Sequence, residues 1–298
     1  MTPSFGSVFT AADRDTGPET FGSSTDTLRS ALRESGAVLV RGVPFDLESF
    51  ERFCGLFSDG AIVHPGTVQG GRRAVTATTA TVDGGVLAFP WHAELGYAPN
   101  RPDLVGFACE RAPAQGDETF LSDGCAIAER LTGTARRVAA LRVRYSYSRL
   151  RASWPLSFDG ALSAHEVEQA LQSIANGLDD GETLEWRFRR WRGSRVKIQY
   201  TTPVLSRVRW GERVAFCNHV IWQESRRRGG GVVLEDGSLL PTDAVEEFTR
   251  LADEESSAVR WREGDLLMVD NTRIMHARGA VVEPACRRIL AHNCHASF

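Results

Sequence analysis

The stretch Trp91-His92-Ala93-Glu94, taken with a histidine far downstream, His276, limits most strongly how this chain can fold. His92 and Glu94 are two positions apart, so on an extended strand both side chains emerge on the same face. Two imidazoles and one carboxylate can occupy one face of an octahedral metal ion and leave the opposite positions open, as in non-haem iron(II) centres. If these side chains bind one ion, the fold must return the late part of the chain to His92.

Length and charge narrow the classes of protein that fit. At 298 residues the chain can bury a sizeable core, and we expect one domain over residues 1–298. The net charge of -3 gives no bulk electrostatic reason to expect nucleic acid or an anionic membrane as a partner, in spite of arginine-rich stretches at 187–192 and 226–231. The cysteines show no C-x-x-C spacing, which argues against a zinc ribbon or a disulfide framework. With no apolar run long enough for a bilayer and no basic-then-apolar N-terminal segment, we expect a cytoplasmic protein.

Many short apolar or alternating runs predict a mainly β protein with α-helical insertions. Helices are expected from Asp26 to Leu32, Leu47 to Phe57, Ala126 to Leu131 and Ala164 to Asn176. Strands are expected at residues 37–40, 74–80, 86–89, 104–110, 119–121, 143–147, 196–200, 204–208, 213–218, 266–269 and 288–293. This pattern suits a jelly-roll (double-stranded β-helix) barrel core with flanking helices. We expect residues 1–25 to form an N-terminal arm, and residues 148–195 and 222–260 to form insertions or a lid.

An iron oxygenase that splits oxygen needs two further electrons, which 2-oxoglutarate can supply by oxidative decarboxylation. The far carboxylate of that co-substrate must be held by a fixed cation, and the planar fork of arginine suits a carboxylate. Arg287 and Arg288 follow His276 and begin an apolar strand. Because adjacent strand residues face opposite ways, only one of the two arginines can point into a barrel.

Four ordered blocks of the sequence resemble the 2-oxoglutarate-dependent oxygenases related to taurine dioxygenase, within the clavaminate synthase-like superfamily. The blocks are residues 89–102, 107–110, 116–123 and 264–278. The resemblance runs from Gly36 to His292 and so covers most of the chain. It implies Fe(II), 2-oxoglutarate and oxygen as cofactor and co-substrates.

The resemblance also implies roles for individual residues. His92, Glu94 and His276 match the iron ligands of the family. Thr119 and an arginine would bind the far carboxylate of 2-oxoglutarate; the pattern favours Arg288, with Arg287 as the alternative.

Two departures from the family pattern bear on the substrate. Glutamate at Glu94, where aspartate is commoner, resembles the branch that includes clavaminate synthase and several amino-acid hydroxylases. His292 stands where taurine dioxygenase-like enzymes carry an arginine for an acidic group, which argues against a sulfonate. We take His292 and Asn218 as candidate substrate-binding residues, although Asn218 suits a turn at a strand end equally well. His64, His165 and His295 have no spacing relation to the triad, and we expect them to be structural or on the surface.

The expected function is therefore an Fe(II)- and 2-oxoglutarate-dependent dioxygenase that hydroxylates or otherwise oxidises an unactivated C–H bond. The substrate expected is an amino-acid-like or peptide-like small molecule of natural-product biosynthesis, either free or tethered to a carrier protein. Two alternatives stay open. One is a zinc-dependent hydrolase that uses the same two histidines and Glu94. The other is a non-catalytic barrel that binds a small acid. The sequence does not fix the oligomeric state.

Overall fold

The computed structural model of the chain describes residues 6–10, 21–64, 71–113, 115–158, 160–189, 195–225, 231–283 and 286–298. Residues 190–194 and 226–230, which hold most of the two arginine-rich stretches, therefore lie outside the described residues. The described part is mainly β structure with several helices, as the sequence predicts.

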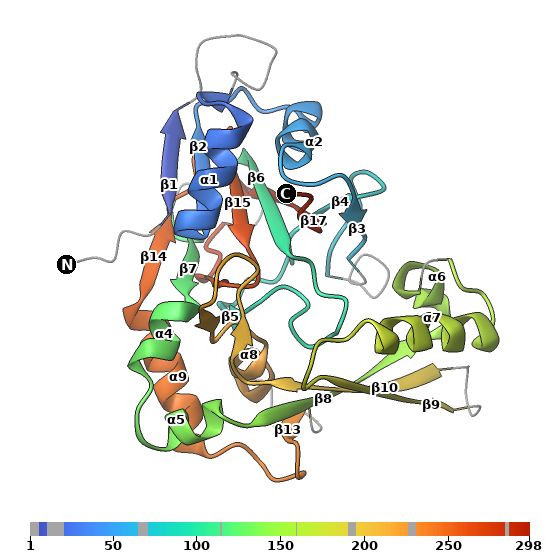
Figure 1. The fold of residues 1–298 in the computed structure, drawn as a ribbon. Helices are drawn as coiled ribbons and strands as arrows, with labels where there is room; N and C mark the ends of the chain where they lie inside the picture. Colours follow the sequence, from blue (N-terminus) through green and yellow to red (C-terminus); the bar gives the residue numbers. More distant parts are fainter. Residues whose placement is uncertain are drawn as a thin grey trace.

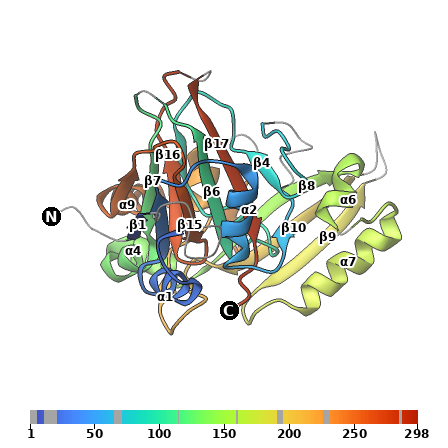
Figure 2. The ribbon, with the colours of Figure 1, turned by 90° about the horizontal axis from the view of Figure 1, so that it is seen from above.

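Two β-sheets face one another at the centre of the molecule (Figures 1 and 2). The larger sheet has seven strands in the order β1-β2-β15-β6-β17-β3, with β4 also paired to β17. Its strands are β1 (Ser7–Thr10), β2 (Ala37–Arg41), β3 (Ala61–Ile62), β4 (Thr79–Thr81), β6 (Leu104–Arg111), β15 (Leu266–Asp270) and β17 (Arg288–Cys294). The smaller sheet, in the order β14-β7-β16-β5, contains β5 (Phe89–His92), β7 (Thr119–Asp123), β14 (Ser256–Val259) and β16 (Ile274–Arg278). In the described strands no hydrogen-bonded pair joins the two sheets, so they do not form a closed barrel.

An outlying sheet extends to one side of the facing pair (Figure 1). It runs β13-β8-β10-β9, and a two-stranded ribbon joins β11 to β12. The strands are β8 (Arg142–Leu150), β9 (Thr183–Arg189), β10 (Arg195–Pro203), β11 (Ser206–Arg207), β12 (Val214–Ala215) and β13 (Val232–Leu234). Helix α7 (Ala164–Asn176) packs on this sheet, with Val167 and Leu171 buried, and a capping box at Ser163 begins it. The short helices η2 (Arg151–Ser153) and α6 (Trp154–Ser157) follow β8.

The remaining helices cover the facing sheets. Helices α1 (Thr25–Ser35) and α2 (Leu47–Gly55) bury Leu28, Leu32, Phe50 and Phe53 against the outer face of the larger sheet. Helix α1 begins at the cap Ser24 and ends at Gly36, whose φ of 76° is readily adopted only by glycine. Helices α4 (Gly124–Arg130), α5 (Gly133–Ala139), α8 (Val220–Ser225) and α9 (Thr242–Glu254) lie near the smaller sheet (Figure 1). Within the described residues no helix is long and apolar enough to cross a membrane.

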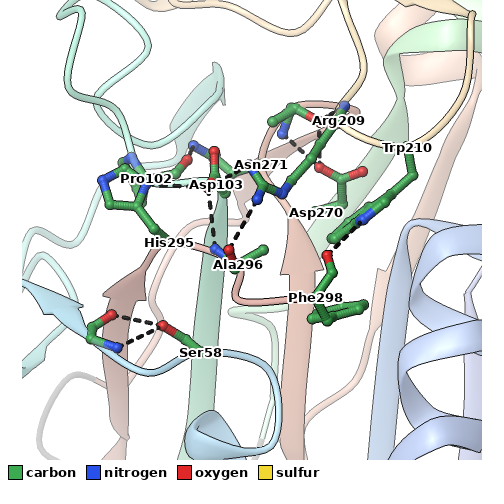
Figure 3. Close-up of polar contacts among 12 residues, drawn as sticks. Ser58, Pro102, Asp103, Arg209, Trp210, Asp270, Asn271, His295, Ala296 and Phe298 are labelled. Atoms are coloured by element: carbon green, nitrogen blue, oxygen red, sulfur yellow. Dashed lines mark hydrogen bonds and ion pairs between the residues drawn. The ribbon is translucent and has the colours of Figure 1, made fainter.

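The C-terminal residues are fixed to two loops by polar contacts (Figure 3). The carboxylate of Asp103 accepts a hydrogen bond from the backbone N–H of Ala296 at 3.1 Å and pairs with Arg209 at 3.0 Å. Arg209 also donates to the carbonyl of Ala296, and the Trp210 indole donates to the carbonyl of Phe298. These contacts hold the end of β17, a strand that contributes to the interior between the sheets.

Several predicted elements are confirmed, including α2, α7, β2, β6 and β17. The prediction of a strand at residues 74–80 is wrong except at its end, where β4 begins at Thr79. Thr76 forms a tight turn instead, because its hydroxyl accepts hydrogen bonds from the N–H groups of Thr78 and Thr79. Helix α9 was not predicted, although Phe248 and Leu251 form a buried face at helical spacing.

One glycine tests how tightly the larger sheet is packed. In Gly264→Ala the new Cβ would lie 1.9 Å from the carbonyl oxygen of Val43, at a φ of +84°. Gly211→Ala is the matched control, because Gly211 has a φ of +101° but no atom within 4 Å of the position that a Cβ would take. The control should lose about 1–2 kcal/mol of unfolding free energy from backbone strain alone. Gly264→Ala should lose about 1–3 kcal/mol more from overpacking. Urea denaturation measures both, and equal losses would contradict the clash.

Candidate metal centre

Two histidines meet across a pair of antiparallel strands. His92 ends β5, and His276 lies directly opposite on β16. Their rings are 4.2 Å apart between centroids, and Phe107 of the larger sheet packs against His276. Ligand atoms of His92, Glu94 and His276 all lie within 4.8 Å of one another, and the three residues are buried. The structure thus brings together the three residues that the sequence singles out, in the space between the two sheets.

Glu94 reaches this position from a turn, whereas the sequence analysis placed it on the strand with His92. Strand β5 ends at His92, and the following turn contains Leu95 with a φ of 53°. The side chain of Asn271 holds the turn: its oxygen accepts from the N–H of Glu94 at 2.7 Å, and its amide donates to the Glu94 carbonyl at 3.0 Å. The same amide donates to the carbonyl of Pro102 at 2.8 Å (Figure 3). Asn271 is completely buried and precedes β16, so it couples the carboxylate to the strand that carries His276.

The imidazole of His92 has the tautomer and the charge that metal binding requires. Its Nδ1 lies 2.9 Å from the carbonyl oxygen of Pro90, which can only accept, so Nδ1 carries the proton and Nε2 keeps its lone pair. Burial, with further contributions from His276 and His219, holds the pKa of His92 well below its usual value. A neutral imidazole with a free Nε2 is the form that binds a metal ion.

Two residues that the sequence analysis did not assign to the site hold the carboxylate of Glu94. Arg72 donates to both carboxylate oxygens at 2.9 Å, and Nε2 of His64 lies 2.8 Å from Oε1. Burial alone would raise the pKa of Glu94, but Arg72 and His64 hold it well below the usual value. Glu94 is therefore an anion even in a buried position. We expected His64 to be structural or on the surface; it is instead largely buried against Glu94, and no spacing in the sequence indicates this contact.

Arg287, and not Arg288, lies beside the three candidate ligands. Arg287 lines the same cavity as His92, Glu94 and His276, whereas the Arg288 side chain is 44% exposed and pairs with Glu110 at 2.9 Å. The pairing of β17 with β6 shifts register between Arg288 and Ile289. Ile289 faces the interior cluster, so Arg288 points outward by strand alternation. The sequence pattern favoured Arg288, but of the two arginines it is Arg287 that the structure places beside the candidate ligands.

Thr119 lines the same cavity, at the start of β7. Its hydroxyl oxygen accepts a hydrogen bond from the indole N–H of Trp261 at 3.0 Å. Because the indole can only donate, the hydroxyl hydrogen of Thr119 remains to be donated to another acceptor. A carboxylate in the cavity would be a suitable acceptor.

Two arginines share one buried carboxylate at this end of the cavity. Asp117 forms an ion pair with Arg287 and lies 3.8 Å from Nε of Arg278. Burial raises the pKa of Asp117 to about 6 and lowers that of Arg287 to about 10, so both are charged at neutral pH. Arg278 also donates to the carbonyls of Asp83, Gly85 and Leu87, and so fixes that loop. Asp83 also lines this end of the cavity and acts on Arg287, so carboxylates and guanidinium groups alternate there.

The sequence analysis proposed two residues for substrate binding. One of them lies on the outer face of the larger sheet, and the side chain of the other forms hydrogen bonds with the backbone of a turn. His292 points to the outer face of the larger sheet, where its Nδ1 is 3.2 Å from the hydroxyl of Thr79 and its ring meets Phe50. The side chain of Asn218 donates to the carbonyl of Val204 and accepts from the N–H of Val220, which is the turn role that the sequence also allowed. Neither His292 nor Asn218 lines the cavity of the three candidate ligands.

The neighbour of Asn218 comes closer to the candidate ligands. His219 donates from Nδ1 to the carbonyl of Ala93 at 3.1 Å, and its ring lies 5.4 Å from that of His92 and 5.0 Å from that of Tyr97. Burial lowers the pKa of His219 to about 4, so it is neutral. Trp91, in contrast, points into the apolar core and donates to Asp253, as strand alternation predicts.

The cavity at the three candidate ligands has a volume of about 50 Å³. Val82, Asp83 and Arg287 also line a larger hollow of about 760 Å³, which gives this end of the cavity a route to the outside. Two imidazoles and one carboxylate suit a divalent transition metal, because they leave coordination positions for other ligands. The donor set of the structure therefore fits Fe(II).

The comparisons with known proteins agree with this geometry. The sequence matches the family described as "Taurine catabolism dioxygenase TauD, TfdA family" over residues 2–294. It is 27% identical over 289 residues to a clavaminate synthase-like protein of Arabidopsis thaliana, covering 90% of this chain and 84% of that protein. The fold is similar to that of a taurine dioxygenase from Burkholderia xenovorans, with a TM-score of 0.62, 16% identity and coverage of 99% and 86% of the two chains. PvcB from Pseudomonas aeruginosa is also similar, with a TM-score of 0.60, 18% identity and coverage of 99% and 87%.

The chain belongs to the TauD/TfdA family of dioxygenases. It is a 2-oxoglutarate-dependent non-haem iron dioxygenase, an enzyme that uses Fe(II), 2-oxoglutarate and oxygen.

Replacement of Asn271 tests the coupling between Glu94 and β16. Asn271→Ala would leave the backbone groups of Glu94 and the Pro102 carbonyl buried without their partner, which should cost about 2–4 kcal/mol of unfolding free energy. Mn(II) or Co(II) affinity, measured by calorimetric titration, should also fall, because the carboxylate is no longer positioned. Asn176→Ala, at an exposed asparagine near the end of α7, is the control and should change neither quantity. Wild-type stability and metal affinity in Asn271→Ala would contradict the coupling.

Proposed function

We propose that His92, Glu94 and His276 bind Fe(II), and that the enzyme oxidises an unactivated C–H bond of an amino-acid-like or peptide-like small molecule in natural-product biosynthesis. The observation that carries the metal assignment is the buried cluster whose ligand atoms lie within 4.8 Å of one another. The substrate class is supported by glutamate at position 94 and by the similarity to the clavaminate synthase-like protein. A structure of PvcB is described as that of an Fe, alpha-ketoglutarate-dependent oxygenase from an isonitrile synthetic pathway, which also supports a small molecule.

The architecture serves this function if the two facing sheets are the core of a double-stranded β-helix within a single domain. The metal ligands then lie between the sheets, at strands β5 and β16. Residues 148–195 and 222–260 supply α6, α7, β9, β13 and α9, which lie outside the two facing sheets. The second range also contains β14, a strand of the smaller sheet, so only its part before Ser256 would be an insertion around that core.

The protein's own groups would position the reactants and keep water out. Fe(II) held by His92, Glu94 and His276 would supply the oxidising power, with 2-oxoglutarate as the source of two electrons as it becomes succinate and carbon dioxide. Arg287 would form two charge-assisted hydrogen bonds with the far carboxylate of 2-oxoglutarate, and Thr119 would donate its hydroxyl hydrogen to it. Phe89 and Phe107 line the cavity and limit the access of water to the reacting atoms.

The roles of Arg72 and His64 would be to position the carboxylate of Glu94. A carboxylate has enough lone pairs to accept their hydrogen bonds and still bind a metal ion. Fixing a ligand through partners of this kind is common in metal sites and raises metal affinity. Both residues thus contribute to the preformed shape of the site.

Anaerobic addition of Fe(II) and then 2-oxoglutarate tests the proposed centre directly. A weak visible charge-transfer band should appear, because the co-substrate chelates the metal at positions that the three protein ligands leave open. Metal analysis and oxygen-dependent succinate formation complete the experiment. A folded protein that gives no charge-transfer band and no succinate would contradict the assignment. In that case, tightly bound zinc would indicate the zinc-dependent hydrolase. The absence of any bound metal would indicate the non-catalytic barrel.

Arg287 and Arg288 allow a matched pair of variants that tests which arginine binds the co-substrate. Arg287→Ala should raise the 2-oxoglutarate concentration at half-maximal succinate formation by about 10- to 100-fold, since charge-assisted hydrogen bonds contribute about 1.5–3 kcal/mol. Arg288→Ala removes the same charge from the next residue, where the side chain is exposed and pairs with Glu110. It should leave that concentration unchanged. The opposite order of the two effects would return the co-substrate role to Arg288.

A further inference from the structure

Arg149 is a buried cation on the outlying sheet. It lies near the end of β8 and is 6% exposed. Strand alternation places it on the same face as Tyr145 and Tyr147, the face that packs toward the apolar core. One guanidinium nitrogen donates to the hydroxyl of Tyr97 at 3.2 Å, and the group lies over the rings of Tyr147 at 4.6 Å and Tyr97 at 5.6 Å.

No carboxylate of the described residues pairs with Arg149, unlike the other buried arginines around the metal cavity. Those arginines have acidic partners: Arg72 pairs with Glu94, and Arg278 and Arg287 pair with Asp117. An unpaired buried charge costs several kcal/mol, and buried charges in proteins are usually paired. Aromatic faces offset part of that cost but do not neutralise the charge. The position therefore calls for an anion that the described protein residues do not supply.

A cavity of about 40 Å³ lies at Arg149. The hydroxyl of Ser157 also lines it, and this buried oxygen has no hydrogen-bond partner among the described residues. The other walls are largely apolar and include Ile62, Leu171 and Ile198. The volume is enough for a group the size of a few water molecules, such as a carboxylate. A guanidinium and a hydroxyl converge there as donors, and both lack an acceptor of sufficient strength.

Shared walls connect this cavity with the candidate metal centre. Ile62 and Val63 line both the Arg149 cavity and a neighbouring cavity of about 30 Å³, which also contains His64 and Arg72. Arg72 in turn lines the cavity of the three candidate ligands. A ligand with one end at Arg149 would thus extend along His64 toward the metal.

A chain of ring contacts joins the same two places. Tyr97, which accepts the hydrogen bond of Arg149, packs on His219, and His219 packs on His92. These contacts fix the direction in which Arg149 lies from the metal and do not depend on the cavity walls. The cavity walls and the rings are thus two separate connections between Arg149 and the candidate ligands.

We propose that Arg149 binds the carboxylate of the substrate, with the hydroxyl of Ser157 as a second donor. This inference rests on the proposed function and deepens it: the substrate is an amino acid or peptide-like acid held by its carboxylate end. Arg287 holds the co-substrate acid, and Arg149 holds the substrate acid. The planar fork of arginine suits a carboxylate, and the small apolar cavity excludes larger anionic groups.

The test uses the full chain loaded with Fe(II) and 2-oxoglutarate. The probes are the twenty proteinogenic L-amino acids and their N-acetyl derivatives, each compared with its primary amide. Succinate formation above the rate without a probe, and the change of the charge-transfer band, measure occupation of the substrate site. At least one acid should stimulate the wild-type enzyme, and its amide should need a concentration at least about 10-fold higher, because the charged hydrogen bonds are lost.

Variants assign that preference to Arg149. Arg149→Gln should raise the half-maximal concentration of the acid by about 10-fold or more, and should bring the acid and its amide to similar values. Arg149→Lys keeps a charge without the fork and should give an intermediate value. Arg187→Gln is the matched control, because Arg187 is an exposed arginine on strand β9 of the same sheet. It should behave as wild type.

Each outcome decides the inference. An amide as effective as its acid, or Arg149→Gln as sensitive to the acid as wild type, would overturn it. If Arg149→Gln does not fold, the comparison of acids with amides in the wild-type enzyme still decides. No response to any probe, with the band and substrate-free succinate formation intact, would reject an amino-acid carboxylate at Arg149 but leave the proposed function in place. Loss of the band and of all succinate would reject both.

Discussion

The pairing of β5 with β16 is the constraint on which the site depends. It sets His92 opposite His276, and the turn before β16 supplies Asn271, which holds the backbone of Glu94. One strand therefore positions one candidate ligand directly and another through a buried amide. Because His276 is distant in the chain from His92 and Glu94, a local segment cannot form the site, and metal affinity depends on the folded pair of strands.

Charge balance in the interior indicates where anions bind. Arg72 and Glu94 neutralise each other at the metal, whereas Arg278 and Arg287 share the single carboxylate of Asp117. Asp83 lines the same end of the cavity, so the arginines there already face carboxylates of the protein. Arg149 differs, because no carboxylate of the described residues pairs with it and aromatic faces and hydroxyls surround it.

Much of the fold and of the candidate site could be predicted from the sequence, because period-two alternation and helical spacing are local signals. The spacing of His92 and Glu94 with His276 indicated the candidate ligands, and the family resemblance implied Thr119; the structure places all four around one cavity. What failed depended on geometry that local spacing does not contain. The register shift at the start of β17 decides between Arg287 and Arg288, and a turn, not a strand, carries Glu94. His64 and Arg72 approach Glu94 through a loop, for which no pattern exists.

The division of these groups between sheets suggests how the enzyme's specificity is separated from its chemistry. The candidate metal ligands and the co-substrate groups lie on or beside the two facing sheets, which bury each other's side chains and tolerate little change. Arg149 and Ser157 belong to the outlying sheet and the short helix that follows it. Substitutions there would alter which acid is held without moving the β5–β16 pair. The contact through Tyr97 and His219 then keeps the substrate end at a fixed distance from His92, which is the condition for oxidising one particular C–H bond.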